Sequence, residues 1–212
     1  MSEEPSHSRC CERCGTELVS CLFCFDCSSL QPLSPSTNYF YALGIPDGFE
    51  LDLTLLEEQF RQIAGELHPD FYMNSSSAEK KLSGRASTLL NQAYDNLKDS
   101  FKRATYLMRL KGKGLEWNER VLPPGFLEEM FSLQEELDAM LEKLDQPGLK
   151  RFQDLLDKRR RDLESGLIRL FKMLENMKEL ELEQVLEQLQ MKLNAERYLQ
   201  RILGRIQVEE IV

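Results

Sequence analysis

The chain has 212 residues, 42% of them hydrophobic and 30% charged, and its formal net charge is −9. This length allows one or two domains with their own cores, and no uninterrupted apolar run is long enough to cross a bilayer. The acidic balance argues against nucleic-acid binding, since a phosphate backbone requires a basic face. The opening MSEEPSHSRC has the character of neither a signal peptide nor an Arg-rich presequence. We therefore expect a cytoplasmic protein, or a mitochondrial-matrix protein if it is a processed eukaryotic form, with no membrane partner.

All six cysteines lie in one short N-terminal stretch and include two Cys-x-x-Cys pairs, Cys11 with Cys14 and Cys24 with Cys27. In each pair the spacing allows both thiolates to bind one metal ion. Four thiolates form the closed tetrahedral shell of a structural zinc site, which leaves no open position for a substrate. So short a segment cannot bury a core, and metal binding would supply its folding free energy. The pattern predicts structural Zn²⁺ held by Cys11, Cys14, Cys24 and Cys27.

The other two cysteines leave alternatives open. The nine residues between the two pairs make a shorter loop than in common four-cysteine sites, and Cys21 with Cys24 is a possible alternative pair. A thiol-redox role would also use Cys-x-x-Cys, but no βαβ pattern surrounds these pairs. The Ser/Pro-rich residues 28–38 follow, and we expect this linker to separate the cysteine-rich segment, residues 1–37, from the next domain.

The next region has the pattern of a helical hairpin. Asp52 or Thr54 can cap its first helix, and Pro69 disfavours helical geometry at His68, where that helix should end. The apolar positions of this helix recur at helical intervals, at Leu56, Phe60, Ile63 and Leu67. Ser76 and Glu79 have the spacing of a capping box for the second helix. Its apolar stripe comprises Leu82, Ala86, Leu89, Leu90, Ala93, Tyr94 and Leu97. We expect the two helices to pack antiparallel, with the 68–75 loop exposed at one end.

Several short motifs occur together in and around this hairpin. They are Tyr39-Phe40, Leu43-Gly44, Phe60-Arg61, His68-Pro69-Asp70-Phe71, Leu90-Asn91-Gln92-Ala93-Tyr94 and Arg103-Ala104-Thr105-Tyr106-Leu107. In this order they resemble a J-domain, here residues 38–115, and more narrowly the HscB type of J-domain co-chaperone. The two Cys-x-x-Cys pairs followed by Leu30-Gln31 are similar to an N-terminal extension found on some members. The resemblance covers essentially the whole chain.

The resemblance implies a co-chaperone and not an enzyme. The J-domain would stimulate ATP hydrolysis by a heat-shock-70-class chaperone, with His68, Pro69 and Asp70 at the contact. J-domains usually carry several basic residues on the helix before this tripeptide, whereas here that helix has Arg61 alone. We therefore assign the basic residues of both hairpin helices to chaperone binding, beside the alternative that the later three are simply solvated charges. They are Arg61, Lys80, Lys81 and Arg85.

Residues 116–212 are typical of three long helices with short connections, which predicts an antiparallel three-helix bundle and an all-α fold for the chain. The predicted core positions of the first helix are Leu127, Met130, Leu133, Leu137, Leu141 and Leu144. Those of the second are Phe152, Leu155, Leu156, Leu163, Leu167, Leu170 and Leu174. Those of the third are Leu182, Val185, Leu186, Leu189, Leu193, Ile202 and Ile206. A coiled-coil dimer is the alternative, which the break at Pro147-Gly148 disfavours.

The resemblance also implies that this bundle binds a client, an IscU-type iron–sulfur scaffold protein. Glu128 occupies a position where the family often has an apolar residue, and we expect Met130 to replace it on the surface. For Phe131 and Tyr198 ordinary core packing is the alternative. By position, the client-binding residues are Leu127, Met130, Phe131, Glu135 and Tyr198. A second function class, a zinc-binding helical adaptor with no chaperone partner, would also explain cysteines and helices together.

Overall fold

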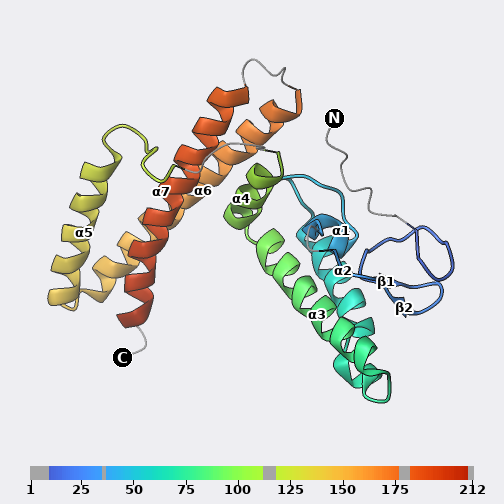
Figure 1. Ribbon diagram of the computed structural model, residues 1–212. Helices are drawn as coiled ribbons and strands as arrows, with labels where there is room; N and C mark the ends of the chain where they lie inside the picture. Colours follow the sequence, from blue (N-terminus) through green and yellow to red (C-terminus); the bar gives the residue numbers. More distant parts are fainter. Residues whose placement is uncertain (1–9, 35–36, 112–117, 177–181, 210–212) are drawn as a thin grey trace. The chain divides into compact units, whose positions relative to one another are not determined.

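Most of the described residues are in helices, which confirms the predicted all-α class (Figure 1). The computed structural model describes residues 10–34, 37–111, 118–176 and 182–209. The chain divides into two compact units, Met1–Arg103 and Ala104–Val212. In the described part, no helix has the combination of length and apolar character needed to cross a membrane.

The cysteine-rich segment opens the first unit with a small antiparallel hairpin. Strand β1 (Phe23–Cys24) pairs with β2 (Ser29–Leu30), so that Phe23 lies opposite Leu30. Ser28, just before β2, has a φ of 51°, and Gly15 has a φ of 76°, the left-handed region that glycine adopts without a Cβ penalty. The chain therefore makes a tight turn at Gly15 and another at Ser28.

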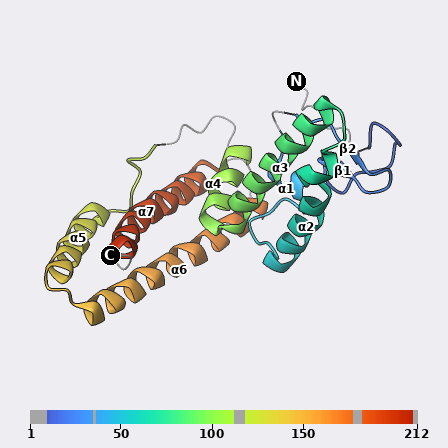
Figure 2. The same cartoon turned by 90° about the horizontal axis from the view of Figure 1, so that it is seen from below.

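The helical hairpin forms as predicted. Helix α1 (Tyr39–Leu43) precedes α2 (Leu53–Glu66), the short 3₁₀ helix η1 (Pro69–Tyr72) and α3 (Ser77–Lys98). Asp52 is the cap of α2, because its carboxylate accepts the backbone N–H groups of Thr54 and Leu55. Ser76 and Glu79 form the predicted capping box of α3. Helices α2 and α3 lie side by side along their facing apolar stripes (Figure 1, Figure 2).

The cysteine-rich segment packs against this hairpin, so the expected separation by a linker is wrong. Ser20, which is fully buried, donates its hydroxyl to the carbonyl of Ala42 in α1 at 2.7 Å, and the Cys21 N–H bonds the Tyr41 carbonyl at 3.3 Å. Gly44 ends α1 with a φ of 65°, and a Cβ there would come within 2.8 Å of the Val19 carbonyl oxygen. The apolar side chain of Leu22 is fully buried. These tertiary contacts hold the segment on the hairpin, although the linker composition suggested a free tether.

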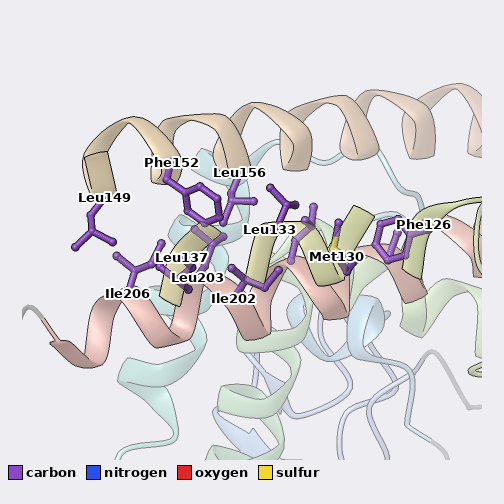
Figure 3. Close-up of a cluster of buried hydrophobic side chains, with 12 residues drawn as sticks. Phe126, Met130, Leu133, Leu137, Leu149, Phe152, Leu156, Ile202, Leu203 and Ile206 are labelled. Carbon is purple, nitrogen blue, oxygen red and sulfur yellow. The ribbon is translucent and has the colours of Figure 1, made fainter. Parts of the chain in front are cut away.

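The second unit contains the predicted three-helix bundle. Helix α4 (Ser100–Lys111) begins just before it, and the bundle comprises α5 (Phe126–Glu142), α6 (Gln146–Asn176) and α7 (Leu182–Glu209). One cluster of buried side chains joins all three helices (Figure 3). Its members are Phe126, Met130, Leu133, Leu137, Leu149, Phe152, Leu156, Ala195, Leu199, Ile202, Leu203 and Ile206. Pro147 lies in the first turn of α6, where its missing N–H breaks no helical hydrogen bond.

Polar contacts also fix the bundle. Asn194 of α7 donates its amide to the carbonyls of Asn118 and Val121, both at 2.9 Å, and so holds the segment before α5 against α7. Arg160 of α6 bonds the carboxylate of Glu196 in α7 at 2.7 Å, and this carboxylate is buried. A buried carboxylate requires such a partner, because its desolvation is otherwise uncompensated.

Four leucines predicted in the core are exposed instead. The clearest case is Leu144, 75% exposed, which follows α5 in a left-handed conformation with a φ of 53° and so points away from the helical stripe. The other three lie at the edge of an apolar stripe, where helical periodicity does not distinguish rim from core. They are Leu127, Leu155 and Leu182.

Candidate functional site

Four cysteines converge in the N-terminal segment. The sulfur atoms of Cys11, Cys14, Cys24 and Cys27 all lie within 4.8 Å of one another, with 3.6 Å between Cys11 and Cys27 and 3.7 Å between Cys14 and Cys24. Tetrahedral thiolate ligands about 2.3 Å from a Zn²⁺ ion would be separated by roughly 3.8 Å. The four cysteines are thus arranged to hold a metal ion, and they are the four that the spacing predicts.

Backbone turns explain this convergence. The Gly15 N–H bonds the Cys11 carbonyl at 2.8 Å, and the Cys11 N–H bonds the Thr16 carbonyl at 2.7 Å, which curls the first pair into one turn. The β1–β2 hairpin carries the second pair. Cys10 and Cys21 lie outside the group of four. Burial raises the pKa of the Cys21 thiol to about 12, so this side chain stays protonated near neutral pH.

Hydrogen-bond donors surround the Cys11 sulfur. The side-chain amide of Gln31 donates to it at 3.4 Å, and the Arg13 N–H donates at the same distance. Burial raises the pKa of the Cys11 thiol, but bonds from the backbone of Cys14 and Arg13 and from the Ser29 hydroxyl outweigh burial and lower this pKa to about 5. A thiolate is the form that binds metal, so this environment suits a ligand. Gln31 was not predicted; its only signal in the sequence was its place in the Leu30-Gln31 motif.

The tripeptide His68-Pro69-Asp70 lies at the tip of the hairpin, and all three residues are exposed. His68 caps η1, because its Nδ1 accepts the backbone N–H of Asp70 at 3.3 Å. The same nitrogen lies 3.5 Å from the Asp70 carboxylate. Two large apolar side chains follow in this loop, Phe71 and Met73, of which Phe71 is 72% exposed. None of these side chains contributes to the core, so their chemistry is available to a partner.

Hydrogen bonds that the sequence did not predict fix the base of this tip. The hydroxyls of Ser83 and Ser87 in α3 both donate to the Leu67 carbonyl, at 2.8 and 3.1 Å. The Tyr72 hydroxyl donates to the Glu66 carbonyl at 3.1 Å. They satisfy carbonyls at the end of α2, which a helix terminus otherwise leaves open. The exposed tip is therefore held in one conformation at its base.

The four predicted basic residues divide between two surfaces. Arg61 is exposed on α2, but its guanidinium is bonded to Glu57 one turn earlier at 2.8 Å. Lys80, Lys81 and Arg85 are exposed on α3 and line a groove there. Their exposure agrees with a binding role and equally with solvated charges.

The predicted client-binding residues do not form one uniform surface. Leu127, Phe131 and Glu135 are exposed on one side of α5, with Phe131 66% exposed. Tyr198 of α7 is half-buried and meets Phe126 edge to face, with ring centroids 5.7 Å apart.

Met130 is not at the surface, so the prediction that it replaces Glu128 as the exposed apolar residue is wrong. It is 3% exposed and belongs to the buried stripe that Phe126, Leu133 and Leu137 also occupy, one turn apart along α5 (Figure 3).

A hairpin with His-Pro-Asp at its tip, followed along the chain by a helical bundle, is the arrangement that the resemblance to J-domain proteins implies. No protein-family model matches it. The chain is 35% identical to a mouse iron–sulfur cluster co-chaperone protein HscB over 131 residues, 61% of this chain and 54% of the mouse protein. It is 38% identical over 104 residues to a co-chaperone protein HscB homolog of Vibrio cholerae strain M66-2, 49% of this chain and 61% of that protein.

Solved structures agree with these similarities. The crystal structure of human co-chaperone protein HscB has a TM-score of 0.75 with 24% identity, covering 95% of this chain and 98% of that one. The chaperone HscB from Vibrio cholerae has a TM-score of 0.67 with 27% identity, covering 82% and 98%. The chain spans little more than half the length of the curated relatives it matches. The chain is therefore similar in sequence to part of the HscB co-chaperones and shares the fold of their solved structures.

Proposed function

We propose that the protein is a co-chaperone that stimulates the ATPase of a heat-shock-70-class chaperone and delivers an IscU-type iron–sulfur scaffold protein to it. The observation that carries this proposal is the exposed His68-Pro69-Asp70 tip, fixed at its base by Tyr72, Ser83 and Ser87. The names of the relatives support it, since the mouse protein is an iron–sulfur cluster co-chaperone. In this proposal residues 1–37, 38–115 and 116–212 are the metal-binding segment, the J-domain and the client-binding domain.

The tip presents a defined donor and a carboxylate to the chaperone. Because Nδ1 of His68 accepts the Asp70 N–H, a neutral imidazole carries its proton on Nε2, and in this proposal that N–H donates to the chaperone. The Asp70 carboxylate lies beside it and offers an acceptor. The hydrolytic chemistry belongs to the chaperone, and the tip acts on it through contact alone.

The client surface in this proposal comprises Leu127, Phe131 and Glu135 of α5, with Tyr198 at its edge. An exposed aromatic beside an aliphatic residue is the kind of anchor that dominates protein interfaces. The nearby carboxylate of Glu135 favours a scaffold with a basic rim. Met130 is not included, because it is buried.

We assign structural Zn²⁺ to Cys11, Cys14, Cys24 and Cys27, because four thiolates at tetrahedral separations suit this ion. Zn²⁺ would crosslink the two Cys-x-x-Cys turns and has no role in a reaction. For the compartment we propose the cytoplasm, or the mitochondrial matrix in a eukaryotic cell.

The test is the steady-state ATPase rate of the organism's own heat-shock-70-class chaperones, measured with and without the protein. Wild type should raise this rate several-fold, and His68→Gln should abolish the increase with unchanged circular dichroism and scaffold binding. Asn74→Ala, an exposed change in the same loop, is the matched control and should stimulate like wild type. Full stimulation by His68→Gln would contradict the proposal. A wild type that stimulates none of these chaperones would favour the adaptor alternative.

A further inference from the structure

A cleft of about 380 Å³ lies between the cysteine-rich segment and the base of the tip. Both sides of it belong to the first compact unit, and strand β2 lies against α3 there. The two sites that the sequence predicted separately, the cysteine ligands and the exposed tripeptide, therefore share one boundary inside the fold. We call six of the residues that line the cleft the segment–hairpin boundary. They are Ser29, Leu30 and Gln31 of the segment and Tyr72, Glu79 and Leu82 of the hairpin.

The segment side of this boundary touches two of the metal ligands. The Ser29 hydroxyl lies 3.0 Å from the Cys27 sulfur and 3.6 Å from the Cys11 sulfur. The side-chain amide of Gln31, which is buried, donates to the Cys11 sulfur at 3.4 Å and to the Ser29 hydroxyl at 2.9 Å. Leu30 follows Ser29 in β2 and lines the cleft. A change in the position of these two sulfur atoms therefore moves one wall of the cleft.

The hairpin side consists of residues that hold the tip in place. The Tyr72 hydroxyl donates to the Glu66 carbonyl at the end of α2. Glu79 accepts the Ser76 N–H at 2.9 Å and so caps α3 directly after the tip loop. Hydrogen bonds from Ser76 lower the pKa of the Glu79 carboxyl, and the positive charge of Arg13 in the segment lowers it further. An electrostatic attraction thus also joins the first cysteine turn to the cap of α3.

The cysteine-rich segment is the part of this arrangement that has two states. Its four ligand sulfur atoms converge within 4.8 Å of one another. A short segment whose ligands converge on one ion folds together with that ion, because the binding free energy is also its folding free energy. Strand β2 and its contact with α3 should therefore be well formed in the metal-bound chain and should loosen when the metal is removed.

We infer that metal binding at the four cysteines orders the base of the His68-Pro69-Asp70 tip through the segment–hairpin boundary. Coupling between two sites is reciprocal, so the same boundary should also raise the affinity of the cysteines for the metal. The effect on the chaperone rests on the proposed function. A chain without metal would have the competent tip for a smaller fraction of the time, so a higher concentration of it would be needed.

The affinity of the full-length chain for Zn²⁺ tests the reciprocal effect without any chaperone. Leu82→Ala changes a half-buried residue of α3, a helix without ligands, and should weaken Zn²⁺ binding at least ~5-fold. Competition with a chromophoric chelator measures this affinity. Leu55→Ala removes the same atoms from the first turn of α2, away from the residues that line the cleft, and is the matched control. It should bind Zn²⁺ within about 2-fold of wild type.

Hydrogen exchange of the backbone from Tyr72 to Leu82 measures the order of the tip base directly. Without metal these amides should exchange at least ~5-fold faster than with one equivalent of Zn²⁺. Helix α1 provides a second route from the segment to α3, because it contacts both. Leu82→Ala separates the two routes. Its exchange from Tyr72 to Leu82 should depend less on Zn²⁺ than in wild type, whereas the exchange of α1 should respond as in wild type.

The chaperone assay uses Cys14→Ser in place of a chelator, because a chelator would also remove the Mg²⁺ that ATP hydrolysis requires. The concentration of this variant for half-maximal stimulation of the ATPase should be at least ~5-fold higher than for wild type, with an unchanged maximal rate. Cys10→Ser is the matched control, since Cys10 lies outside the group of four, and it should stimulate like wild type.

Two results would overturn the inference and leave the proposed function intact. One is an unchanged Zn²⁺ affinity in Leu82→Ala, and the other is exchange from Tyr72 to Leu82 that is the same with and without Zn²⁺. Normal stimulation by Cys14→Ser would overturn the effect on the chaperone. Exchange that depends on Zn²⁺ in a wild type that stimulates no chaperone would contradict the proposed function and support the link between metal and tip.

Discussion

Two aromatic side chains at the edge of the bundle lie in different environments. Phe131 projects from α5 and is mostly exposed. Tyr198 packs against the core, touches Phe126 edge to face and has the Arg201 guanidinium 5.5 Å from its ring centroid. Helical periodicity alone could not distinguish core packing from surface exposure for either residue. Their burial decides which property each substitution should change.

Phe131→Ala should weaken binding to an IscU-type scaffold by at least ~2 kcal/mol, because exposed aromatic anchors dominate such interfaces. Its free energy of unfolding should stay within about 0.5 kcal/mol of wild type, as for other surface changes. Tyr198→Ala should instead lower that free energy by about 1–3 kcal/mol, less than for a fully buried aromatic. Calorimetry of unfolding and of binding measures both, with Glu136→Ala as the surface control. A large loss of stability in Phe131→Ala with unchanged affinity would place this side chain in the core.

The Tyr94 hydroxyl of α3 donates to the Glu57 carboxylate of α2, and its ring stacks on Phe60 with centroids 4.2 Å apart. The Tyr94 hydroxyl, followed by the Arg61 guanidinium, lowers the pKa of Glu57. A carboxyl with a lowered folded pKa stabilises the fold fully above its unfolded pKa, about 4.3. This contribution is lost as the pH falls through the lower folded value.

Tyr94→Phe keeps the ring and removes the hydroxyl donor to Glu57. Protonation of Glu57 at acid pH should then lower the free energy of unfolding by less than it does in wild type. Urea unfolding at about pH 5 and about pH 3 measures this as a smaller difference between the two free energies than in wild type. Tyr198→Phe removes a hydroxyl in the other unit and is the control. It should show the same difference between the two free energies as wild type. If Tyr94→Phe and wild type lose the same stability on acidification, the Tyr94–Glu57 bond does not account for the lowered pKa.

Among the elements, those with strong periodic patterns and capping residues were predicted from the sequence. Helices α2 and α3 have both, and the cap of α3 forms at Ser76. Helix η1 was missed because it is one turn without an apolar period. The docking of the cysteine-rich segment was missed because it rests on the Ser20–Ala42 and Val19–Gly44 contacts. Such contacts join positions far apart in the sequence and leave no periodic signal.

That docking changes the expected effect of metal removal. Chelation should unfold the cysteine-rich segment and also lower the protection of α1, because the bonds to Ala42 and Tyr41 are lost with it. Hydrogen exchange with and without a strong chelator should show at least ~10-fold faster exchange in α1, with smaller effects in α5–α7. Unchanged exchange in α1 would mean that the hairpin is independent of the segment.

Cysteine variants separate metal loss from other effects of the chelator. Cys14→Ser should lose the metal and show the faster exchange of α1 without chelator, because three thiolates no longer complete the tetrahedral shell. Cys10→Ser should retain about one metal ion per chain, as Cys10 lies outside the group of four. Loss of the metal in Cys10→Ser would contradict this ligand set. Elemental analysis of the purified chains measures it.

For the whole molecule, the sequence predicted where the metal-binding cysteines and the exposed tripeptide lie, but not which apolar side chains of the bundle are exposed. Cysteine spacing located the four ligands, and the tripeptide located the tip. Leu127 and Phe131 were predicted together with Met130, yet the first two are exposed and Met130 is buried. A single sequence does not show which apolar positions of a helical stripe face a neighbouring helix. The two proposed partner contacts lie in different compact units of one chain, which permits a test of whether they must act together.

Delivery of a client requires both contacts on one chain, because tethering gives the bound scaffold a high effective concentration near the chaperone. His68→Gln retains the client surface and Phe131→Ala retains the tip. An equimolar mixture of these variants should therefore give no more scaffold-dependent ATPase stimulation than the sum of the two alone. The measurement is the steady-state ATPase rate as the scaffold is titrated at constant total co-chaperone. The control is an equimolar mixture of wild type with a double variant that carries both His68→Gln and Phe131→Ala. This mixture should respond like half the amount of wild type. Full wild-type stimulation by the mixed single variants would show that the two contacts work independently, and the delivery role would fail even if each contact exists.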